Sequence, residues 1–104
     1  MSYSSILCLS TCLLLSFTSS ASAADDAGKK TYEGACAVCH ATGVAGAPKF
    51  ADKEAWKTRI KTGNEALYNT ALKGKGAMPA KGGRADLSDD DVKAAVDYMV
   101  SNAK

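Results

Sequence analysis

Hydrophobic positions recur at helical spacing in four segments of the chain, and no segment shows the alternating pattern of a useful β-strand. The spacing predicts helices over about residues 25–39, 52–61 and 64–73, and a last helix that follows Ser88. Two glycine-rich loops, at 42–49 and 73–83, separate these helices, because glycine and proline favour turns. The pattern therefore predicts an all-α domain of about four helices.

The predicted helices have recognisable starts and apolar faces. Asp52, Asn64 and Ser88 each carry a side-chain oxygen that can cap a first helical turn. Gly28 lowers helix propensity, so we expect it to mark a close helix crossing. The apolar faces comprise Gly28, Tyr32, Ala35, Cys36 and Cys39; Ala55, Trp56 and Ile60; Leu67, Tyr68, Ala71 and Leu72; and Val92, Ala95, Val96 and Met99.

The N-terminal residues differ in composition from the rest. An apolar run at 6–17 is followed by small residues that end at 21–24. This pattern predicts a signal peptide over 1–23, cleaved at its end, and a domain over 24–104 that is exported from the cytoplasm. No basic residue precedes the run, so an uncleaved anchor stays open, as does lipidation at Cys12. The run is short and interrupted for a membrane span, so we expect no stable membrane insertion.

Charge and size limit the possible functions. The formal net charge is +2, from 13 basic and 11 acidic residues, which gives no case for binding nucleic acid. A domain of this size buries a modest share of its surface and usually needs a disulfide, metal or cofactor to be stable. Without the signal peptide, Cys36 and Cys39 are the only cysteines left, and His40 is the only histidine.

These three residues lie within the sequence Cys-Ala-Val-Cys-His at 36–40, the attachment signature of a c-type haem. Residues three apart lie on one helical face, so both thiols can reach one porphyrin edge and form thioethers. The histidine that follows can ligate the iron. We therefore predict one covalently attached haem c. A zinc site would need further cysteine or histidine ligands after His40, and the sequence has none there. A redox dithiol usually accompanies a βαβ pattern, and the sequence shows none.

The second axial ligand has two candidates, because only Met78 and Met99 carry a thioether after the signal peptide. Met99 lies on the apolar stripe of the last helix, where a methionine usually fills the core. Met78 precedes Pro79 in a glycine loop and has no core role there. The sequence thus favours iron held by His40 and Met78. This ligation raises the reduction potential and fills both axial positions, which favours electron transfer over catalysis.

Three further residues are candidates to support the haem. The carbonyl of Pro48 could accept the second ring N–H of His40, since metal-ligating histidines usually donate that proton. Trp56 and Arg59 could donate hydrogen bonds to haem propionates. The alternatives are a plain turn proline, a core tryptophan and a solvated arginine.

Taken together, these motifs resemble the class I cytochromes c, and in particular the small bacterial cytochrome c-five group. The similar segments are 45–49, 55–56, 77–83 and 87–99. Many members have a second cysteine pair after the methionine loop that forms a disulfide. Residues 83–87 contain no cysteine here, so the chain is similar to the disulfide-free relatives.

The resemblance implies a small class I cytochrome c fold around one haem, with the cysteines, His40, Met78 and Pro48 in the roles given above. It also implies that Gly28 and Tyr32 meet Ala95 and Tyr98 where the terminal helices cross. The group consists of periplasmic electron carriers of bacterial respiratory or related chains.

The predicted function is that of a soluble, monomeric one-electron carrier between redox proteins, not an enzyme. Lys49, Lys73, Lys75 and Lys81 lie in the two loops expected to border the haem edge. They could steer an acidic partner, or they could be ordinary solvated lysines. The competing functions are a haem-based sensor or weak peroxidase with a dissociable methionine, and a dithiol or metal module without haem.

Overall fold

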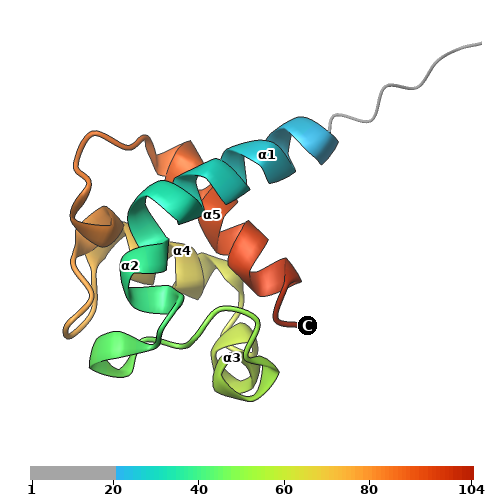
Figure 1. The fold of residues 1–104 in the computed structure, drawn as a ribbon, viewed down its shortest axis with the longest axis vertical. Coiled ribbons are helices and arrows are strands. Elements are labelled where there is room, and N and C mark those ends of the chain that lie inside the picture. The colour runs from blue at the N-terminus through green and yellow to red at the C-terminus, as the bar shows by residue number, and fades with distance from the viewer. Residues whose placement is uncertain (1–20) are drawn as a thin grey trace, which may run out of the picture.

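The computed structural model describes residues 21–104, and it is built of helices joined by loops (Figure 1). The predicted all-α class is confirmed, since an isolated bridge between Lys75 and Met78 is the only β-pairing among these residues. The predicted signal peptide up to residue 20, with the open question of Cys12, lies outside the described residues. The elements in order are α1 (Ala21–Thr31), the π-helix η1 (Tyr32–Cys36), α2 (Ala37–His40), the 3-10 helix η2 (Val44–Gly46), α3 (Lys53–Ile60), α4 (Asn64–Lys73), the 3-10 helix η3 (Ala80–Gly83) and α5 (Asp89–Ser101).

Two of the three expected helix caps are present. The Asp52 side chain accepts a hydrogen bond from the Ala55 amide, and Ser88 accepts one from the Asp91 amide, both at 3.1 Å. The third expectation was wrong, because α4 starts on Asn64 itself and Gly63 precedes it as the cap. Gly63 has a φ of 94°, a backbone conformation that glycine adopts far more readily than asparagine.

The first helical segment is longer and less regular than predicted. It begins at Ala21 rather than Asp25, and it ends at His40. Within it, the amide of Ala37 donates to the carbonyl of Tyr32, which is the wider turn of a π-helix. No helix of residues 21–104 is long and apolar enough to cross a membrane.

Helix α1 crosses α5, and this contact joins the two ends of the domain (Figure 1). At the crossing, a Cβ on Gly28 would overlap the carbonyl oxygen of Ala94 and lie 3.1 Å from the Cβ of Tyr98. The Tyr32 ring lies 5.6 Å from the Tyr98 ring and packs in one core cluster with Ala95. The expected meeting of the terminal helices is confirmed.

Replacing Gly28 by alanine should destabilise the protein by about 1–3 kcal/mol, the usual cost of overpacking, although alanine is the better helix former. The added methyl group would press on backbone atoms, which cannot move aside as a flexible side chain can. Denaturant unfolding of the haem-loaded protein would measure the change. Gly34→Ala is the matched control, because its methyl group would lie 4.0 Å from the nearest atom, on Arg84. An equal loss in both variants would contradict the crossing as the cause.

Helix α5 also has a second buried edge, which packs on α4. Ala71 of α4 and Val92, Val96 and Val100 of α5 form a second core cluster, and Met78 packs against it. The predicted apolar faces of α3, α4 and α5 are therefore the faces turned inward. The consequence for the site is geometric: the cysteine motif is fixed on the α1 side of α5, and the methionine loop on the α4 side.

Candidate functional site

A cavity of about 560 Å³ lies between α2 and the loop that carries Met78. Its volume falls within the range of about 300–1,000 Å³ that small-molecule and cofactor sites occupy. Cys36, Cys39, His40 and Met78, the four residues predicted to hold a haem, all line it. Residues separated by up to 42 positions are thus brought to one site by the packing of both chain halves on α5.

A hydrogen bond to the backbone fixes the orientation of the His40 ring. The imidazole is 7% exposed, and its Nδ1 lies 2.8 Å from the carbonyl oxygen of Pro48. With Nδ1–H donating to this carbonyl, Nε2 is the ring nitrogen that remains for a metal. The contact expected between Pro48 and His40 is therefore present. The amide of Phe50 also donates to the His40 carbonyl at 2.6 Å, which holds the loop against α2.

The two thiols are free and half-buried in the cavity wall. Burial raises the pKa of the Cys36 thiol, which disfavours the thiolate that a redox dithiol or a zinc site would require. Among residues 21–104, no group of three or more histidine, cysteine or acidic side chains is placed to hold a metal ion. These observations count against both alternatives without haem.

Met78 is held in a short hairpin. The Lys75 amide donates to the Met78 carbonyl at 2.9 Å, and the Met78 amide donates to the Lys75 carbonyl at 3.0 Å. Gly74 makes this turn possible, because it has a φ of 81° and a Cβ there would lie 2.7 Å from the Met78 carbonyl oxygen. Met99, by contrast, is 3% exposed in the core and does not line the large cavity.

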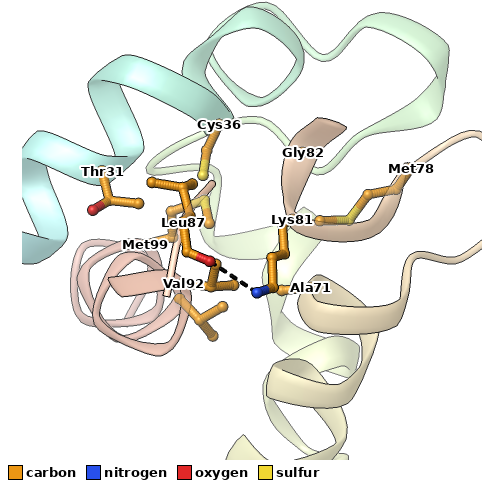
Figure 2. A pocket seen from close by; sticks show the side chains of 10 residues that line it. Thr31, Cys36, Ala71, Met78, Lys81, Gly82, Leu87, Val92 and Met99 are labelled. Atoms are coloured by element: carbon orange, nitrogen blue, oxygen red, sulfur yellow. Dashed lines mark hydrogen bonds between the residues drawn. The ribbon is translucent and has the colours of Figure 1, made fainter. Parts of the chain in front are cut away.

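A small recess of about 20 Å³ continues the site inward (Figure 2). It shares Cys36, Met78 and Gly82 with the large cavity. Apart from Thr31 of α1 and Lys81 of η3, its remaining wall is apolar and belongs to α4, α5 and the segment before α5. A flat apolar macrocycle placed between the cysteines and Met78 would meet this wall: Ala71, Leu87, Val92, Val96 and Met99.

The two predicted propionate donors have different surroundings. Trp56 is 4% exposed, its indole N–H donates to the Lys49 carbonyl at 3.0 Å, and it does not line the cavity. Its side chain therefore has the core role that was the alternative, and a propionate contact has no support. Arg59 does line the cavity, and its guanidinium donates to the Ala55 carbonyl of its own helix. Arg59 stays a candidate donor.

One cavity-lining cation was missed by the sequence reasoning. Arg84 forms two hydrogen bonds of 2.8 Å with the carboxylate of Asp86, and this pairing lowers the pKa of Asp86 to about 2. A third contact, 3.5 Å long, reaches the carbonyl of Gly34 in η1. The residue lies in a loop without periodicity, so no pattern pointed to it.

The four lysines proposed for docking divide into two kinds. Lys49, Lys73 and Lys75 are exposed, and Lys75 lines the cavity. Lys81 is half-buried, and its ammonium bonds to the Leu87 carbonyl and to Asp89. At the cavity wall, Val38 is 77% exposed, an unusual degree for a large apolar side chain.

Comparison with known proteins agrees with this site. Residues 23–99 match a family model described as cytochrome c oxidase, cbb3-type, subunit III. Cytochrome c-555 of Chlorobaculum tepidum is 52% identical over 82 residues, which span 75% of this chain and 76% of the relative. The chain is a class I c-type cytochrome. Cytochrome c5 of Azotobacter vinelandii is 50% identical to this cytochrome over 66 residues, covering 62% of this chain and 80% of that one.

Solved structures share the fold of this cytochrome. The cytochrome c in an electron-transfer complex with nitrite reductase is 52% identical, with a TM-score of 0.72 over 75% of this chain and 95% of that one. The reduced cytochrome c551 of Ectothiorhodospira halophila is 39% identical, with a TM-score of 0.60 over 72% and 97% of the two chains. The predicted class I cytochrome c fold and the resemblance to the cytochrome c-five group are confirmed.

Cytochromes of this family carry one covalent haem c with its iron, and the residues present here fit that group. Free Cys36 and Cys39 can form the thioethers, and His40 already has the second-nitrogen contact that an iron ligand needs. The apolar recess suits the macrocycle. When bound, the haem supplies one-electron exchange between ferric and ferrous iron.

Proposed function

We propose that this cytochrome is a soluble one-electron carrier in which His40 and Met78 hold the iron from opposite sides. The observation that supports this most directly is that both side chains line one cavity, each fixed by its own backbone hydrogen bonds. The relatives carry the names of electron-transfer cytochromes, and one solved relative forms an electron-transfer complex.

The proposed roles follow from the chemistry of the side chains. Cys36 and Cys39 anchor the ring, and His40 keeps its orientation through Pro48. The Met78 thioether raises the reduction potential relative to harder ligands. With both axial positions filled, no coordination site is left for oxygen, peroxide or a substrate, which is the basis for proposing a carrier rather than an enzyme.

Spectroscopy of the wild-type protein tests this proposal. The ferric form should show the weak long-wavelength band of thioether ligation, and the ferrous form should resist carbon monoxide at neutral pH. Rapid carbon monoxide binding without the band would instead support the sensor or weak peroxidase. Mass spectrometry of the exported protein should find one haem on a chain that starts at residue 24, as expected if residues 1–23 are a signal peptide for the periplasm.

We further propose that Lys49, Lys73 and Lys75 steer an acidic redox partner toward the cavity mouth of the monomer. All three residues are exposed and Lys75 lines the cavity, whereas the ammonium of Lys81 is engaged internally. The association rate should fall as salt rises from about 0.01 to 0.15 M, because the Debye length shrinks from roughly 30 to 8 Å. Stopped-flow oxidation by an acidic redox protein would measure it. A rate independent of salt would remove this docking model.

A further inference from the structure

Lys81 differs from every other lysine near the site, because its ammonium group is bound within the molecule. Its Nζ donates to the carbonyl oxygen of Leu87 at 2.8 Å and lies 3.0 Å from the Asp89 carboxylate. The side chain is 23% exposed, whereas that of Asp89 is 66% exposed. Figure 2 shows the Lys81 side chain extending to the Leu87 carbonyl, and its stem lines the apolar recess beside Met78.

These contacts connect two segments that the iron site needs to keep together. Lys81 follows Met78 by three residues and belongs to η3, which packs on α4. Leu87 and Asp89 lie at the start of α5, which Ser88 caps. Lys81 therefore joins the methionine loop to the first turn of the helix on which both core clusters are built.

The backbone at this position indicates that the side-chain contacts matter. Lys81 has a φ of 54°, in the left-handed region that costs free energy for any residue with a Cβ. Gly82 follows with a φ of 63°, and its Cβ position would lie 2.8 Å from the Ala35 carbonyl oxygen. A glycine at 81 would adopt the same turn without strain, so the turn alone does not require a lysine.

We propose that Lys81 is a positioning residue that keeps Met78 on the iron by fastening its loop to Leu87 and Asp89. This inference rests on the proposed ligation by Met78. Carbon monoxide binds only when the methionine has left, so its apparent affinity reports the fraction of open molecules. Without the fastening contacts, the loop moves away more often, and that fraction rises.

The test measures carbon monoxide affinity of the ferrous protein, together with the ferric thioether band and the unfolding midpoint. Lys81→Met keeps the apolar stem and removes both polar contacts. It should raise the affinity about tenfold, which corresponds to roughly 1.4 kcal/mol. Lys81→Gly relieves the backbone strain and should raise the affinity as well. Asp89→Asn should give a smaller increase.

Two matched controls should leave the affinity unchanged. Lys57→Met removes an exposed lysine of α3 that does not line the cavity, and Asp90→Asn removes a carboxylate from the same helical turn as Asp89. If Lys81→Met and Lys81→Gly lower only the unfolding midpoint, with band and affinity at wild-type values, the residue is merely structural and the proposal is wrong. Should Lys81→Met fail to fold, Asp89→Asn measured against Asp90→Asn decides the matter. A wild-type protein without the thioether band would instead overturn the ligation by Met78 itself.

Discussion

Replacing Met78 by alanine should convert the carrier into a protein with an open iron site. The thioether that lines the same cavity as His40 would be gone, and no other methionine of residues 21–104 lines the large cavity. If the wild-type site is open in about 0.1–10% of molecules, carbon monoxide affinity should rise roughly 10- to 1,000-fold. The reduction potential should fall by on the order of 100 mV, part of the roughly 0.8 V range that axial ligands set.

A substitution at the second methionine, Met99, is the control for this result. Met99→Leu alters the other thioether of residues 21–104, but Met99 is 3% exposed in the core of α5. It should leave the ligation band and the potential at wild-type values and cost less than about 1.5 kcal/mol of stability, as volume-conserving core changes do. If Met99→Leu abolished the band while Met78→Ala kept it, the ligand assignment would be reversed.

A chain that cannot attach haem should lack stable tertiary structure. Cys36→Ala/Cys39→Ala would leave the cavity of about 560 Å³ without its macrocycle. Water would then fill this open cavity, and its wall would lose the burial that the macrocycle provides. A domain of this size buries a modest share of its surface, so it has little other stability to lose.

Near-ultraviolet circular dichroism and NMR of that double variant would measure the effect. We expect a weak near-ultraviolet signal and poorly dispersed resonances, with some helical signal retained. His40→Gly, which keeps the thioethers and removes the iron ligand, separates attachment from ligation and should be the better folded of the two. Sharp, dispersed resonances from the haem-free chain would show that α1, α4 and α5 fold without the cofactor.

Much of the fold follows from local patterns in the sequence. The apolar stripe of α5 was predicted at Val92, Ala95, Val96 and Met99, and all four side chains are buried. Asp52 and Ser88 mark real helix starts, because a cap depends only on neighbouring residues. The Asn64 prediction failed for a local reason as well, since the positive φ at that turn favours the glycine one residue earlier.

The parts that sequence reasoning missed depend on contacts made by loops, which no repeating sequence pattern predicts. Arg84 reaches Gly34, 50 positions earlier, and Lys81 turns inward to Leu87 and Asp89. Trp56 was considered for the haem because its indole N–H needed an acceptor, and the acceptor is the Lys49 carbonyl. All three contacts depend on how the loops pack beside the helices. The loops have no periodic pattern from which this packing could be predicted.

The π-helix at Tyr32–Cys36 has a consequence for how relatives should be aligned. An α-helix turns by about 100° per residue, and a π-turn holds one residue more than an α-turn. The extra residue sets the rotation between the Gly28 crossing and the Cys36 attachment point. A relative with an unbroken α-helix here would need one residue fewer to aim its first cysteine the same way. A one-residue alignment gap before the Cys-x-x-Cys-His motif would then indicate that the π-turn is absent from that relative. It would not indicate that the helix crossing and the attachment point are differently spaced.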